Sequence, residues 1–201
     1  MPDNPVNQTI VAVIEQQFDK HALAVGRVAI AWSGLHETMG ELFASIATPD
    51  NEGVGWDIWH SSKADRAQRA MLEAVAKTAL GKDHPVCKEI LWALGKTNPL
   101  EDCRNDAIHA PYAMIFEDGS LKIIPKDFTG NVRARKLKDR DLDKELRSYE
   151  KRIHALTLFI RDLRLYDWRR KSPPPLPPRP SLRQHAQDLT RTTKRRRTPD
   201  K

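Results

Sequence analysis

The chain has 201 residues, of which 39% are hydrophobic, and a net charge of +7 at neutral pH. This length and composition favour one globular domain with an appendage, and no run of about 18 uninterrupted apolar residues is present that could cross a membrane. Because the polar start of the chain lacks the basic and apolar regions of a signal peptide, the sequence predicts a cytoplasmic protein.

The positive charge is concentrated at the C-terminus. From Lys171 to Lys201 there are nine Lys or Arg and two Asp or Glu residues, so this segment carries the whole net charge. Residues 1–170 have no net charge, so net charge gives no indication that this part of the chain binds nucleic acid. The two cysteines, Cys87 and Cys103, predict neither a disulfide framework nor a zinc site, because they lie far apart and form no paired motif.

The N-terminal half of the chain predicts two long helices. Residues 1–19 form a separate segment with a short helix over 9–18, and the first long helix covers 20–47. Its apolar residues recur at steps of four and three, which indicates one buried stripe: Val28, Trp32, Leu35, Met39, Leu42 and Ile46. Pro49 and the glycine-rich stretch 51–55 predict a loop, which would contain Trp56, Trp59 and His60.

The second long helix is expected to begin with Ser61 or Ser62 as its cap and Asp65 in its first turn, and to stop at Gly81. Its predicted inner face consists of Ala67, Met71, Ala74, Val75 and Thr78. A short helix over 86–94 then ends at Gly95. Asn98, Pro99 and Glu101 are three start signals for a further helix of about three turns, which Pro111 closes.

A hairpin and a final helix complete the predicted domain. Apolar runs at 112–116 and 121–124 flank Asp118-Gly119, a strong hairpin signal. A loop follows over 127–135, and the last helix covers 139–169. Its apolar stripe contains Leu142, Leu146, Tyr149, Ile153, Leu156, Ile160 and Leu163. The predicted fold is all-α, an up-and-down bundle of four to five helices with a small hairpin before the last one, over residues 20–170.

The segment from Arg104 to His109 carries the residues best suited to chemistry. Asn105 and His109 lie four positions apart, so they share one helix face, with Arg104 about 140° from His109. Arginine is a permanent cation that matches phosphate geometry, and histidine transfers protons near neutral pH. The dipole at a helix C-terminus favours the imidazolium form of His109. RNA supplies its own nucleophile, the 2′-hydroxyl, so this pair could cleave it without a metal.

An Arg followed by Asn, His or Asp, then three residues and a His, on the third main helix of an α-bundle, resembles the motif of the HEPN superfamily. Arg104, Asn105 and His109 match it position by position. The resemblance implies a homodimer in which both copies of the motif meet at one cleft, and a metal-independent endoribonuclease that uses no cofactor. Arg104 would stabilise the phosphate, His109 would act as general acid and base, and Asn105 would orient one of them.

The same resemblance leaves the biological setting open. Relatives act as toxins, in phage defence or in RNA processing, and a toxin would have a cognate antitoxin or another protein partner. Other relatives keep the fold and lack activity, so the alternative is a non-catalytic helical interaction module. In that case His109 would cap its helix and Arg104 would pair with Glu101. Asp106 is expected to be a solvated charge or an arginine partner.

Residues outside the motif have simpler interpretations. The first long helix is expected to expose a solvated face that contains His36, Glu37 and Glu41. The alternative is that one of these residues assists the motif. No pair of histidines has metal-ligand spacing, so no metal is expected.

Residues 171–201 predict a disordered, proline-rich basic tail. The stretch 173–180 should be extended polyproline II, and its Pro174 to Arg179 portion has the spacing that SH3-type grooves accept. The alternatives are a stiff solvated spacer and nonspecific attraction of nucleic acid by the cationic cluster Lys194, Arg195, Arg196 and Arg197.

Overall fold

The computed structural model describes residues 5–117, 120–127, 130–166 and 173–182. It is mostly helical, with one two-stranded antiparallel sheet before the last long helix, as the sequence predicts. The elements in chain order are α1 (Pro5–Ala47), α2 (Glu52–Ser61), α3 (Asp65–Leu80), α4 (Pro85–His109), β1 (Tyr112–Glu117), β2 (Ser120–Pro125), α5 (Val132–Leu137) and α6 (Leu142–Arg164). None of the helices in these ranges is both long and apolar enough to cross a membrane.

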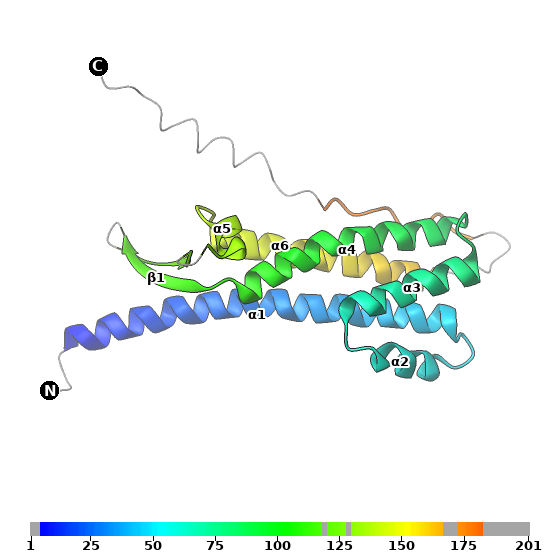
Figure 1. The fold of residues 1–201 in the computed structure, drawn as a ribbon, viewed down its shortest axis with the longest axis horizontal. Helices are drawn as coiled ribbons and strands as arrows, with labels where there is room; N and C mark the ends of the chain where they lie inside the picture. The colour runs from blue at the N-terminus through cyan, green and yellow to red at the C-terminus, as the bar shows by residue number, and fades with distance from the viewer. Residues whose placement is uncertain (1–4, 118–119, 128–129, 167–172, 183–201) are drawn as a thin grey trace, which may run out of the picture.

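The core lies mainly between α1, α4 and α6. Both apolar stripes predicted from the sequence are confirmed, because every member of the 28–46 stripe on α1 and of the 142–163 stripe on α6 is buried. α1 runs the length of the molecule (Figure 1), with α2 and α3 beside its C-terminal half and the hairpin beside its N-terminal half. Burial of these stripes supplies the main driving force for folding.

α1 is one helix of 43 residues, and the prediction of a separate short helix over 9–18 is wrong. No proline or glycine lies between residues 9 and 20 to interrupt it. The helix therefore continues past the end of the bundle, and Ile10, Ile14 and Phe18 on this part of it are exposed.

α2 occupies the region predicted as a loop. Gly55 is a packing residue here, because a Cβ at this position would lie 2.6 Å from the Cα of Ala44 on α1. This close approach lets α2 lie on α1 with Trp59 only 1% exposed, while Trp56 is half-buried and His60 exposed. Trp56 stacks on His60 with ring centroids 5.0 Å apart.

α3 begins at Asp65 with Ala64 as its N-cap, so the predicted serine caps are wrong, whereas Gly81 ends it as predicted, with φ of +85°. Its buried residues are Gln68, Arg69, Leu72 and Ala76. The predicted inner face is wrong for Ala67, Ala74 and Thr78, which are exposed, while Met71 and Val75 pack at its edge. This rotation turns an arginine and a glutamine toward α1.

α4 is a single helix of 25 residues that contains Pro99, so the predicted break at Gly95 is absent. A proline inside a helix removes one backbone donor and crowds the carbonyl four residues earlier, but burial of α4 residues on both sides of Pro99 opposes a break. The imidazole of His84 caps the start by accepting from the Val86 N–H at 3.2 Å. The helix ends before Pro111 as predicted, and the Arg104 to His109 segment forms its last turns.

The predicted hairpin is confirmed: β1 pairs with β2 in antiparallel orientation, with Tyr112 opposite Pro125 and Phe116 opposite Leu121. The predicted loop after it contains the helix α5. The Asn131 side chain caps α5 by accepting from the N–H groups of Arg133 and Ala134, at 2.9 and 3.2 Å. Leu137 of α5 packs with Ala110 and Leu142 in a second small core.

The last helix is shorter than predicted and is followed by an extended segment over 173–182. Leu176 and Leu182 of this segment pack against the main core. Arg179 makes a paired contact with Glu89 of α4, with Nε to Oε2 at 2.6 Å, and lies 5.0 Å from the centre of the Trp92 ring. This part of the predicted tail therefore rests on the bundle. The cationic cluster Lys194, Arg195, Arg196 and Arg197 lies outside the described residues.

Candidate functional site at the end of α4

Arg104 is half-buried at the point where α4 faces α1. Its Nη1 donates to Oδ1 of Asn105 at 2.8 Å, and its guanidinium carbon lies 5.9 Å from the centre of the Trp32 ring. Its Nε is buried and has no hydrogen-bond partner. Among the described residues no carboxylate forms an ion pair with Arg104, so its charge remains available to an anion.

His109 is exposed and is the last residue of α4. Asn105, one helical turn earlier, is half-buried and is already engaged as the acceptor for Arg104. The last turns of α4 thus carry an exposed histidine at the C-terminal end and, about one turn earlier, a cation hydrogen-bonded to an amide. Arg104 can bind an anionic group, and the exposed His109 can exchange a proton with a group in solvent.

Asp106 differs from the prediction of a solvated charge, because it is only 6% exposed. Its Oδ2 lies 3.4 Å from Nζ of Lys136 on α5. Tyr112 lies beside it and donates its hydroxyl to the carbonyl oxygen of Ala107 at 3.1 Å. Burial and the nearby Asp106 carboxylate raise the pKa of Tyr112 to about 12, so this hydroxyl keeps its proton. Asp106 and Tyr112 hold the end of α4 in place.

A buried polar network lies beneath Arg104, between α1 and α3. The indole N–H of Trp32 donates to Asp65 at 2.8 Å. Nδ1 of His36 lies 3.2 Å from Oε1 of Gln68, and Nη1 of Arg69 lies 3.5 Å from Nε2 of His36. Arg69 also pairs with Glu101 of α4, so the expected pairing of Glu101 with Arg104 is absent.

The prediction of a solvated face is wrong for His36, which is 7% exposed. Gln68 donates its amide N–H to the carbonyl oxygens of Trp59 and Ser62, so its Oε1 must accept from His36. Arg69 donates to the other ring nitrogen, which makes His36 a neutral Nδ1–H tautomer. Burial lowers the pKa of His36, and the nearby Asp65 carboxylate opposes this only in part. Glu37 and Glu41 are exposed and half-buried respectively, and Glu41 pairs with Arg164 at 3.0 Å.

The motif lies outside two open cavities on the surface of the described residues. One, of about 370 Å³, lies between α4, α6 and the extended segment, and the other, of about 340 Å³, between α1 and α6. Neither is lined by Arg104, Asn105 or His109. Within the described ranges, no three His, Cys, Asp or Glu side chains gather so that they could hold a metal ion.

Sequence reasoning missed Trp32 and Arg69 as neighbours of the motif. Trp32 was assigned to the core by its spacing, and nothing in the sequence shows that an arginine stacks on it. Arg69 lies three residues before Leu72 and seven before Ala76, on the buried face of α3, and a prediction based on apolar residues alone does not place an arginine there. Comparison of the chain with protein-family models, with curated proteins and with solved structures gave no match.

Proposed function

We propose that the protein is a metal-independent endoribonuclease of the HEPN type, with Arg104, Asn105 and His109 as its catalytic residues. The observation that carries this proposal is the state of Arg104, a half-buried cation held by an amide and an indole rather than neutralised by a carboxylate. A cation in this state can bind a phosphodiester, and His109 is exposed five residues further along the same helix.

The reaction uses the 2′-hydroxyl of RNA as nucleophile. This oxygen attacks the adjacent phosphorus while a neutral histidine takes its proton. The bond from phosphorus to the 5′-oxygen breaks, and an imidazolium gives that oxygen a proton. The products are a 2′,3′-cyclic phosphate and a 5′-hydroxyl. Arg104 stabilises the charge that develops on the phosphoryl oxygens.

Two histidines are required if one acts as acid while another acts as base, which supports a homodimer. A single chain presents one such motif, and neither described cavity includes it. The exposed apolar residues Ile10, Ile14 and Phe18 on α1 supply a surface that a second copy would cover. The proposed partners are therefore RNA, a second copy of this chain and, if the enzyme acts as a toxin, a cognate antitoxin.

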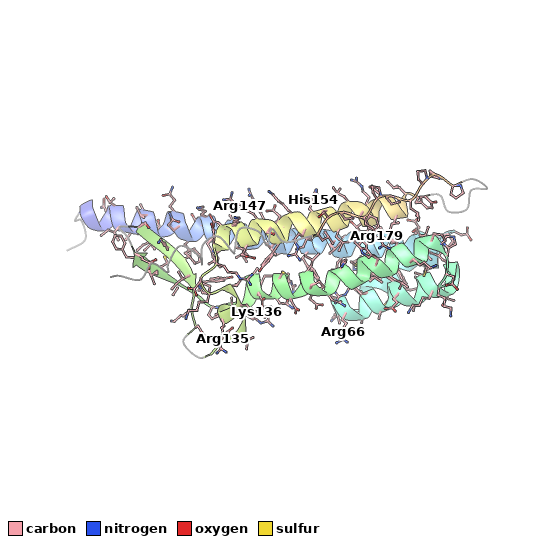
Figure 2. The ribbon with its side chains drawn as sticks, turned by 90° about the horizontal axis from the view of Figure 1, so that it is seen from above. Arg66, Arg135, Lys136, Arg147, His154 and Arg179 are labelled. Carbon is pink, nitrogen blue, oxygen red and sulfur yellow. The ribbon has the colours of Figure 1, made fainter. Side chains whose placement is uncertain are left out.

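The test is RNA cleavage by the full chain in excess EDTA. We expect products with 2′,3′-cyclic phosphate ends, and a fall in rate of about 100-fold or more for both Arg104→Ala and His109→Ala. His154→Ala is the matched control, because His154 is exposed on α6, on the far edge of the molecule from α5 in Figure 2. Undiminished cleavage in both motif variants would refute the assignment.

A non-catalytic interaction module is the second candidate. One observation favours it: Nε of Arg104 is buried, and the guanidinium already has two partners within the chain. This candidate predicts that no RNA is cut under any condition and that Arg104→Ala lowers the stability of the fold as its main effect.

A further inference from the structure

α5 and the residues that follow it form a strongly basic surface, of which the sequence predicts only residues 132–135 to be a loop. Between residues 132 and 140 the chain has five cations and one acid. The cations are Arg133, Arg135, Lys136, Lys138 and Arg140. We propose that this surface binds the phosphate backbone of single-stranded RNA and holds it beside the motif, an inference that rests on the proposed function.

The position of α5 is fixed by contacts with the end of α4. Leu137 is buried against Ala110, the residue that directly follows His109. Lys136 reaches Asp106, which lies between Asn105 and His109 in the motif, with 3.4 Å between Nζ and Oδ2. An RNA strand whose phosphate lies at His109 therefore meets α5 within its next nucleotides.

The orientation of α5 leaves Arg135 and Lys136 exposed to solvent, as Lys138 is just after the helix, while Arg133 is half-buried. Ala134 and Leu137 are buried and define the inner face, while the Asn131 cap fixes the first turn. The side chains of Arg135 and Lys136 are 64% and 51% exposed. Figure 2 shows both at the same edge of the molecule, away from the edge that carries Arg147 and His154.

The charge of this surface is only partly balanced. Lys136 pairs with the buried Asp106, and Arg140 pairs with Glu145 at 3.3 Å. The contact of Arg135 with Asp127 is long, at 3.8 Å. Within the described residues, Arg133 and Lys138 have no carboxylate at ion-pair distance. An exposed Lys138 and a half-buried Arg133 without carboxylate partners, beside the exposed Arg135 and Lys136, form a cluster of positive charge near the motif. Such a cluster is the electrostatic pattern of a nucleic-acid surface.

The test measures binding of a fluorescent 20-nucleotide single-stranded RNA to the full chain by anisotropy, over a range of salt concentrations and in EDTA. The test variant carries Arg133→Gln, Arg135→Gln and Lys138→Gln, which spare the Lys136 and Arg140 pairs and so leave no buried acid unpaired. The control carries Lys77→Gln, Lys88→Gln and Arg161→Gln, exposed cations at the opposite end of the bundle. Both variants lose the same net charge.

We expect the α5 variant to bind about 10- to 100-fold more weakly than the parent protein, and its log–log salt slope to be smaller by about 2. The control variant should bind within about threefold of the parent. All binding assays use the His109→Ala background so that cleavage does not interfere.

The outcomes separate this inference from the proposed function. Loss of binding confined to the α5 variant supports the surface, even if no preparation cuts RNA, in which case only the nuclease assignment fails. Equal binding by the α5 variant and the parent, equal losses in both variants, or no binding by the parent would each overturn the inference.

Discussion

At the scale of single residues, the buried network between α1 and α3 determines how Arg104 is presented. Trp32 is held by Asp65 through its indole N–H, and the Arg104 guanidinium lies on its ring. Arg69 lies on the same ring, 6.0 Å from its centre, and pairs with Glu101. With Glu101 occupied in this way, Arg104 has no ion-pair partner among the described residues.

The neutral state of His36 makes stability depend on pH. Because burial lowers its pKa below the ordinary value of 6.5, the unfolded chain binds more protons than the folded chain as pH falls below 6.5. The free energy of unfolding should therefore fall on acidification through this range, by at most about 1.4 kcal/mol per pH unit for this one group.

His36→Gln should flatten this dependence, since glutamine can form both hydrogen bonds without titrating. The measurement is chemical unfolding between pH 7.5 and 5.5. His21, whose pKa is also lowered by burial, will leave a residual slope. The exposed His154→Gln serves as the matched control and should keep the parent slope, and an unchanged slope in His36→Gln would contradict the assignment of a neutral His36.

The sequence predicted the motif but not its surroundings. The spacing within one helix is enough to single out the candidate site residues Arg104, Asn105 and His109. The stacking on Trp32 and the diversion of Glu101 to Arg69 depend on how three helices pack, which no spacing within one element reveals.

At the scale of elements, glycine explains the main error in the predicted fold. The glycines of the 51–55 stretch predict a loop, yet Gly53 and Gly55 lie inside α2, and Gly55 is needed there because the backbone of α1 passes so close to it. The stripes of α1 and α6 were predictable because each spans several turns with one face buried. The short helices α2 and α5 were not, since their length allows few apolar repeats.

Gly55→Ala should destabilise the protein by about 1–3 kcal/mol, although alanine is the better helix former, because its Cβ would lie 2.6 Å from the Cα of Ala44. Gly34→Ala is the matched control in α1, because a Cβ at this position has nothing within 4 Å. This substitution should stabilise the protein by about 0.5–1 kcal/mol. Thermal and denaturant unfolding measure both. Stabilisation by both substitutions would mean that α2 does not pack on α1 in this way.

At the scale of the whole molecule, the extended segment 173–182 changes the expected role of the tail. Arg179 is the residue an SH3-type groove would need, and here it contacts Glu89 and Trp92, while Leu176 packs on the core. A binding partner for this stretch would first have to detach it from α4.

A homodimer is expected to use the exposed apolar part of α1. The double variant Ile14→Glu with Phe18→Glu places two charges on this face and should give a monomer in light scattering, with loss of RNA cleavage. Leu165→Glu is the matched control, since Leu165 is 70% exposed at the other end of the bundle. A double variant that remains dimeric would place the interface elsewhere.

The central claim is that a fixed arginine and an exposed histidine at the end of α4 act together on RNA. Its most direct test is the chemistry of RNA ends after incubation with the full chain in EDTA. We expect 2′,3′-cyclic phosphate and 5′-hydroxyl ends that disappear with Arg104→Ala and with His109→Ala but persist with His154→Ala. Intact RNA under all conditions, or the same ends from the two motif variants, would contradict it.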